Sequence, residues 1–305
     1  MIKKAPSAEK VLKTSFLVDL LDISLNLIVA LLTGSIVMVA ETIQGFADAI
    51  SDIFLIIGVN ASKKINKAKH AFGYGKSIYF WVFVAGIIIL SITSVITFYV
   101  GLVRFFNPEV IENVFLAYIV LSISIVSNGY SFSLGFRRII QKERLKNFLR
   151  VYRESQMVEI KTTFVLDFIG VAVAVIGLVS LAIYGFSGDA RFDGIGAMII
   201  AVLLAIMALS ILKRTHELII GARAPKSIEE KIKKAALSVK NVRHVLGLKT
   251  MNIGIKKLLV AIDIHVNRNL KTRQIELLTD EVKSVIKKKV PEAYHIQVEI
   301  ETPKH

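Results

Sequence analysis

The sequence contains no cysteine among its 305 residues. Disulfide bonds are therefore excluded, and so is any metal site built from thiolates. Side-chain oxygens and imidazoles remain as the ligands with which this chain could bind a metal.

Several function classes find no support in the chain. We find no nucleophile paired with a base and no phosphate-binding loop, so an enzyme is not expected. The net charge is +15, from 39 Lys and Arg against 24 Asp and Glu. Much of this charge lies in short links between apolar runs, and the basic tail lacks an aromatic stacking array. A nucleic-acid partner is therefore not expected either.

Long apolar runs fill the first two thirds of the chain. Each is long enough for the ~20 residues that cross a hydrocarbon core of ~30 Å. Residues 14–215 are therefore predicted to form six transmembrane helices, preceded by a cytosolic segment of residues 1–13. The six runs are Thr14–Thr33, Val37–Ser62, Ser77–Phe105, Val114–Phe136, Met157–Tyr184 and Gly194–Leu212.

Basic residues divide the links between these runs into two kinds. The N-terminus, the link between the second and third runs and the link between the fourth and fifth runs are rich in Lys and Arg, whereas the other three links are not. The positive-inside rule places the basic links, and with them both termini, in the cytosol. We expect the plasma (inner) membrane of a prokaryote. The basic stretch Arg137–Arg153 could also bind anionic lipid headgroups, although its role in topology is sufficient to explain it.

The last part of the chain reads as a soluble domain. Residues 216–226 are predicted to be a linker, and residues 227–305 a cytosolic α+β domain of order αββαβ, with helices on one face of a small open sheet. Its predicted elements are a helix capped by Ser227, strands at Leu248–Asn252 and Lys257–Val266, a helix at Thr272–Lys289 and a strand at Tyr294–Glu301.

Polar residues recur inside the second and fifth runs. A carboxylate at the bilayer centre costs about 2.5–3.5 kcal/mol on insertion scales, so such residues usually face a cavity or a partner. In the second run Gln44 and Asp48 are four residues apart, and in the fifth run Thr163 and Asp167 have the same spacing. Asp48 and Asp167 are both about ten residues inside their runs, which at ~1.5 Å per residue is mid-membrane. The two carboxylates are predicted to share a divalent cation, with neutral oxygens one turn away.

Other polar residues in the runs have more than one interpretation. Glu41 and Asp52 share the helical stripe of Asp48 and are candidate pathway residues, but solvation at the helix ends would also explain them. Asn26 could face the cavity or make an interhelical hydrogen bond. Asp19 and Asp22 are expected near the cytosolic interface, where either could line the inner mouth. The deep ligands are all oxygens, which favour harder ions such as Mn²⁺, Fe²⁺ or Mg²⁺ over Zn²⁺.

Three stretches resemble the cation diffusion facilitator (cation efflux) family. They are LTGSIVMVAETIQGFADAISD from Leu32 to Asp52, HAFGYGKSIYFW from His70 to Trp81, and the αββαβ tail, which is similar to the family's metallochaperone-like (ferredoxin-like) cytosolic domain. The YFW ending and the ELIIGARAP stretch look more like the branch that contains the mitochondrial-type zinc transporters. The resemblance covers essentially the whole chain.

The resemblance implies a homodimer that exchanges a divalent cation for protons by alternating access. The metal ion (Zn, Mn or Fe) is then the substrate, and no cofactor is bound permanently. The family's site is a pair of residues four apart on the second helix and another pair on the fifth, in many members His or Asp followed by Asp. Here Asp48 and Asp167 match the second positions, whereas Gln44 and Thr163 depart from the first.

Two alternatives stay open at this stage. Because the first ligands are missing, the chain could be a degenerate member that acts as a non-transporting membrane metal sensor or interaction scaffold. In the tail, Asp263, His265 and His295, with Glu299, could form a regulatory metal site, but a surface or packing role explains isolated histidines beside strands equally simply.

Overall fold

The computed structural model describes residues 8–64, 69–140 and 158–302. The chain divides into two compact units, one made of residues up to 60 together with 79–216, the other of residues 61–78 together with 217–305. Lys3, Lys4, Lys67 and the basic stretch from Lys142 to Arg153 lie outside the described residues.

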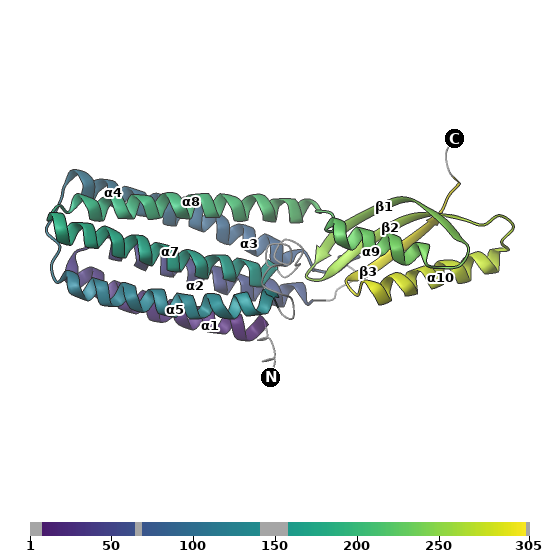
Figure 1. Ribbon diagram of the computed structural model, residues 1–305, viewed down its shortest axis with the longest axis horizontal. Helices are drawn as coiled ribbons and strands as arrows, with labels where there is room; N and C mark the ends of the chain where they lie inside the picture. Colours follow the sequence, from purple (N-terminus) through teal and green to yellow (C-terminus); the bar gives the residue numbers. More distant parts are fainter. Residues whose placement is uncertain (1–7, 65–68, 141–157, 303–305) are drawn as a thin grey trace. The chain divides into compact units, whose positions relative to one another are not determined.

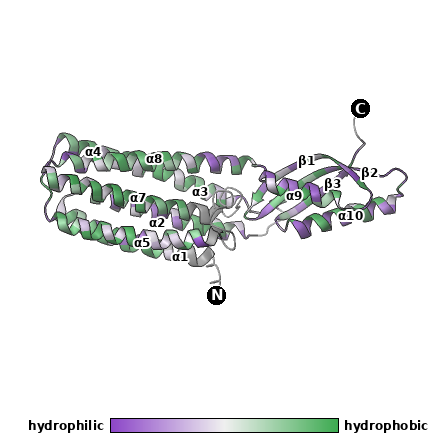
Figure 2. Cartoon of the chain, in the orientation of Figure 1, coloured by the Kyte–Doolittle hydropathy of each residue, from purple (hydrophilic) through white to green (hydrophobic). Residues whose placement is uncertain are grey.

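Six spans in the described chain are long and apolar enough to cross a membrane, which confirms the predicted number. In Figure 1 they run side by side, and in Figure 2 hydrophobic residues follow them along most of their length. The spans are α1 (Ala8–Thr33), α2 (Ile36–Ser62), a third built from α3 (Ser77–Ile88), η1 (Ile89–Ser94) and α4 (Val95–Phe106), then α5 (Val114–Ile140), α7 (Val158–Ser187) and α8 (Arg191–Ile220).

Two features of the spans differ from the prediction. The third span is interrupted by the π-helical turn η1, within which Ser94 Oγ donates a hydrogen bond to the Ile89 carbonyl five residues earlier, over 2.9 Å. Apolar periodicity does not reveal such a turn, because its residues are as apolar as their neighbours. In addition, α8 continues to Ile220, beyond the apolar run that ends at Leu212, since backbone hydrogen bonding continues where the side chains become polar.

The helices α2 and α7 occupy the middle of the bundle. Two clusters of buried apolar residues form its interior. One joins α2 and α7 to α1 and α5, through residues such as Met38 and Leu181, and the other joins them to η1 and α8, through Val37 and Val173. The helices α2 and α7 contribute to both clusters, and buried polar residues such as Gln44 and Asp167 lie on them.

The C-terminal domain has the predicted order αββαβ. It consists of α9 (Lys226–Leu237), β1 (Val242–Gly254), β2 (Lys257–Val266), α10 (Thr272–Lys289) and β3 (Ala293–Ile300). The strands lie in the order β1-β2-β3, with β1 antiparallel and β3 parallel to the central β2. The parallel pairing requires a crossover, and α10 supplies it.

Alternation along β2 builds the core of this domain. Its even-numbered residues from Leu258 to Val266 are buried with apolar residues of α9 and α10, and the two helices contact each other on that face of the sheet. The predicted serine cap is wrong, because α9 begins at Lys226 after Pro225 and makes no side-chain cap. The strand β1 begins at Val242, six residues before the predicted start.

Candidate metal site

The polar stripe of α2 lies inside the bundle. Glu41, Gln44, Asp48 and Asp52 are all buried, with no more than 9% of any of them exposed. Gln44 Nε2 donates a hydrogen bond to Asp48 Oδ2 over 3.3 Å, so the residue at the first position of the pair orients the carboxylate at the second. Solvation at the helix ends is therefore not the explanation for Glu41 or Asp52.

Asp167 lies on α7, the second of the two central helices. It is 2% exposed, and its carboxylate and that of Asp48 repel each other electrostatically. Thr163 lies one turn earlier on α7, but its side chain is outside the described part of the structure. The two predicted carboxylates, on two different helices, are thus close enough to interact electrostatically.

A small cavity lies beside Asp48. Its volume is about 10 Å³, and it is lined by Gln44 and Asp48 of α2, Thr93 of η1, Leu166 and Ile169 of α7 and side chains of α8. That volume is on the order of the smallest space that holds one water molecule. Across residues 8–64, 69–140 and 158–302, no group of three or more His, Asp or Glu side chains is arranged to hold a metal ion.

The acids of α1 are buried inside the bundle. Asp19 and Asp22 are each 5% exposed. Asp22 accepts hydrogen bonds from three α5 side chains, those of Ser124 over 3.4 Å, Ser127 over 3.0 Å, and Asn128. Asn26 is also buried, and its Oδ1 has no hydrogen-bond partner among the described atoms. Apolar flanking residues could not show which face of α1 turns inward.

These acids form one electrostatic group. Asp19 is repelled by Asp52, Asp48 and Asp167, and Glu41 by the carboxylates of Asp22 and Asp48. Like charges interact strongly in a medium of low dielectric constant, and buried ionisable residues of membrane spans typically mark ion pathways. These like-charge interactions link α1, α2 and α7.

A second buried polar network lies at the opposite end of α2 and was missed in the sequence. The Asp193 carboxylate accepts hydrogen bonds from Ser35 Oγ over 2.7 Å and from the backbone nitrogens of Ile36 and Val37 over 2.7 and 3.0 Å, and so caps α2. Arg104 of α4 forms an ion pair with Asp193, with 3.8 Å between Arg104 Nε and Asp193 Oδ2. The Arg104 guanidinium also donates a hydrogen bond to the Gly34 carbonyl oxygen. The network holds the starts of α2 and α8 to the end of α4.

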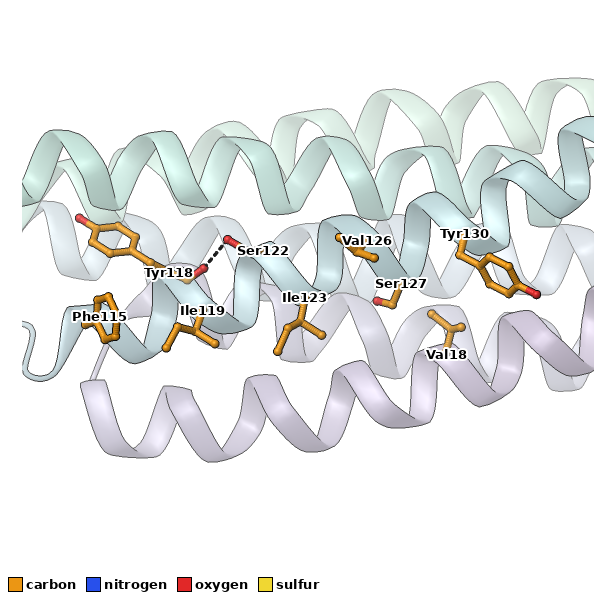
Figure 3. Close-up of a pocket in the computed structure, with 9 residues that line it drawn as sticks. All are labelled: Val18, Phe115, Tyr118, Ile119, Ser122, Ile123, Val126, Ser127 and Tyr130. Atoms are coloured by element: carbon orange, nitrogen blue, oxygen red, sulfur yellow. Dashed lines mark hydrogen bonds between the residues drawn. The ribbon is translucent and has the colours of Figure 1, made fainter.

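The wide groove between α1 and α5 is not the metal site. Its volume is about 870 Å³, and none of its nine lining residues is charged. Figure 3 shows Val18 of α1 facing Ser127 and Tyr130 of α5 across it. Its two serine hydroxyls already donate hydrogen bonds within the protein. Ser122 donates to the Tyr118 carbonyl oxygen and Ser127 to the Asp22 carboxylate. The groove is lined mainly by apolar side chains and has no charged ligand for a cation.

Of the predicted cytosolic residues, Glu299 of β3 pairs in register with Asp263 of β2, whereas His295 lies apart from them. His295 pairs in register with Leu259, four positions along β2 from Asp263, which is about 13 Å at the rise of a strand. His295 instead contacts the Phe72 ring, with centroids 5.5 Å apart.

His265 and Asp263 lie on the sheet face away from the helices. The His265 ring stacks beside His244 with centroids 6.3 Å apart, and its Nδ1 lies 3.1 Å from the Glu301 carbonyl oxygen. His244 was missed because the first strand was expected to begin after it.

Two family models match the chain. One, described as the cation efflux transmembrane domain, covers residues 12–220. The other, described as the cation efflux protein, cytoplasmic domain, covers residues 224–303.

Individual relatives are distant. The proton-coupled zinc antiporter SLC30A9, mitochondrial, of Xenopus laevis is 23% identical over 297 residues, which are 93% of this chain and 52% of that protein. The zinc transporter ZitB of Pectobacterium atrosepticum is 22% identical over 252 residues, 82% of this chain and 73% of that protein. The chain thus spans about half the length of the mitochondrial relatives. A solved MamM CTD variant in a nickel form is 20% identical, covers 26% of this chain and 100% of its own, and has a TM-score of 0.25.

The two family models agree with the architecture of the structure. The first ends where α8 ends, at residue 220, and the second begins just before α9. The described spans are the transmembrane domain, and the αββαβ domain is the cytosolic one. Together the models cover nearly all of the chain, and the protein belongs to the cation efflux family.

Proposed function

We propose that the protein carries divalent metal cations out of the cytosol in exchange for protons. The observation that supports this most directly is the position of Asp48, which is buried on α2 and interacts electrostatically with Asp167 of α7. A dication between two carboxylates neutralises both, in a place where each charge alone is costly. The names of the relatives, a proton-coupled zinc antiporter and a zinc transporter, point to the same function.

Proton exchange follows from the same two groups. When the cation leaves, the carboxylates again repel each other, and protons that bind to them remove the repulsion. Because the cavity beside Asp48 is about 10 Å³, the cation enters and leaves only when the bundle rearranges. The π-helical turn η1 lines this cavity through Thr93. Such turns within α-helices often occur at functional sites, so we expect the rearrangement to involve η1.

The cation is proposed to be of the Zn²⁺, Mn²⁺ or Fe²⁺ class. Gln44, Asp48 and Asp167 offer only oxygen as a ligand atom, which favours the harder ions, whereas both named relatives are zinc proteins. Competition among the three ions for uptake into vesicles would decide between these two indications.

The assembly and the membrane are also proposals. The match of the cytoplasmic-domain family model supports a homodimer, and the mass of the purified chain in detergent tests it. The plasma membrane of a prokaryote is supported by the bacterial ZitB relative, which is matched over 73% of its length.

Metal-dependent proton flux is the test. The purified chain is placed in proteoliposomes that contain a pH dye, and Zn²⁺ or Mn²⁺ is added outside. We expect each transported metal to change the internal pH, with no change in protein-free liposomes. Metal binding without any flux would contradict transport and favour the non-transporting sensor or scaffold.

A further inference from the structure

Asp19 is a buried acid that the proposed pair of carboxylates leaves unexplained. It lies in the α1 span and is only 5% exposed. Its Oδ2 is buried and has no hydrogen-bond partner among the described residues. A carboxylate oxygen without a partner inside a span is costly, so its retention calls for a ligand.

The neighbours of Asp19 show which way it faces. Its carboxylate is repelled by those of Asp52 and Asp48 on α2, of Asp167 on α7 and of Asp22 on α1 itself. Asp52 is 1% exposed and lies four residues after Asp48 on α2, which is about 6 Å further along the helix. Asp19 is therefore directed toward α2 and α7, into the interior of the bundle.

The depths of these residues agree. At ~1.5 Å per residue, Asp48 and Asp52 lie about 18 and 24 Å from the start of α2, and Asp19 about 21 Å from the adjoining end of α1. Asp19 is thus level with the turn of α2 between Asp48 and Asp52. That turn lies on the cytosolic side of Asp48, because the positive-inside rule has α2 running toward the cytosol.

Asp22 provides the contrast. It has the same chemistry, lies three residues further along α1 and is equally buried, yet Ser124, Ser127 and Asn128 of α5 satisfy its oxygens. Packing of α1 on α5 therefore explains Asp22. No comparable set of donors surrounds Asp19 Oδ2 in the described structure.

We propose that Asp19 and Asp52 form a second cation-binding position, one helical turn to the cytosolic side of Asp48, from which the cation passes to Asp48 and Asp167. This inference rests on the proposed function and names its cytosolic entry step. Two carboxylates from two helices neutralise a dication, as Asp48 and Asp167 do. Asp19 also supplies a negative charge, whereas Gln44 and Thr163 at the first positions of the two pairs are neutral.

Equilibrium binding of Zn²⁺ and of Mn²⁺ to the full chain in detergent tests the proposal. Asp19→Asn is expected to weaken binding about tenfold, which corresponds to the loss of one charged ligand, and Asp19→Glu to restore most of it. Asp22→Asn is the matched control and is expected to leave the affinity within about twofold. Unchanged affinity in a folded Asp19→Asn variant would overturn the proposal.

A double variant tests whether the two acids share one ion. If they do, Asp19→Asn with Asp52→Asn weakens binding by much less than the product of the two single effects. Multiplicative effects would mean that the residues act separately and would overturn the shared position. The proposed function would be contradicted by a different result, namely a wild-type chain that neither binds nor transports metal. If the wild-type chain transports metal and the Asp19→Asn variant binds it with normal affinity, only the present inference is refuted.

Discussion

Gln44 and Asp48 lie one turn apart on α2, and Gln44 Nε2 donates a hydrogen bond to Asp48 Oδ2 over 3.3 Å. The other amide atom, Gln44 Oε1, is buried without a hydrogen-bond partner among the described residues. The glutamine therefore orients the carboxylate and leaves an oxygen available to a cation. This relationship makes position 44 the place where the choice of metal is most easily changed.

Gln44→His is expected to shift selectivity toward zinc. An imidazole one turn from Asp48 favours Zn²⁺ over Mn²⁺ because zinc binds nitrogen ligands well, and we expect the ratio of the two apparent affinities to change about tenfold. Uptake by proteoliposomes at graded concentrations of each ion measures the ratio. The control Gln44→Ala should weaken both ions, and an unchanged ratio in Gln44→His would mean that residue 44 does not contact the ion.

Arg104→Gln is expected to destabilise the protein strongly. The Arg104 and Asp193 side chains are 5% and 0% exposed, and removing one partner of a buried pair costs about 3–5 kcal/mol because the other charge stays buried. The matched change is Glu109→Gln, since Glu109 also pairs with Arg104 but is 80% exposed, where such pairs contribute about 0–1 kcal/mol. Thermal unfolding in detergent compares them, and equal shifts would contradict the network.

Gly101→Ala tests the contact between α4 and α8. A Cβ at this position would lie 2.8 Å from the Gly194 carbonyl oxygen, so the helices must separate, at a cost of about 1–3 kcal/mol. Gly129 in α5 has no atom within 4 Å of such a Cβ. Gly129→Ala should therefore be neutral or stabilise the helix by about 0.5–1 kcal/mol. The same melting temperature for both variants would count against this packing.

Two adjacent leucines of α10 test the cytosolic core. Leu278 is 5% exposed and belongs to the core of the domain, whereas Leu277 is 63% exposed. Leu278→Ala is expected to cost about 2–5 kcal/mol through the lost contacts and the cavity, and Leu277→Ala within about 0.5 kcal/mol. Hydrogen exchange of β2 and α10 in the full chain measures the difference. Equal protection in the two variants would mean that α10 packs differently.

Most of the fold could be predicted because its signals are local. Six apolar runs of membrane length are visible in the composition, and alternation along Lys257–Val266 shows which face of β2 is buried. The π-helical turn at Ile89–Ser94 was not predictable in the same way, because it changes hydrogen bonding without changing polarity. Nor was the start of β1 at Val242, since His244 and Gly247 break the apolar alternation there.

The candidate site was only partly visible in the sequence. Spacing of four residues and equal depth identified the pairs on α2 and α7, and the resemblance matched Asp48 and Asp167 to the second positions of the family's pairs. The burial of Asp19 could not be predicted, because the rotation of α1 depends on its packing against α5 and α7. The bond between Asp193 and the start of α2 joins residues more than 150 positions apart, which no local pattern can indicate.

Metal uptake by proteoliposomes containing the double variant Asp48→Ala with Asp167→Ala tests the central claim most directly. We expect wild-type chain to accumulate Zn²⁺ or Mn²⁺ with opposite proton movement, and the folded double variant to lose uptake by at least about a hundredfold. If the double variant moves metal at the wild-type rate, these two carboxylates are not the place where the cation crosses the membrane.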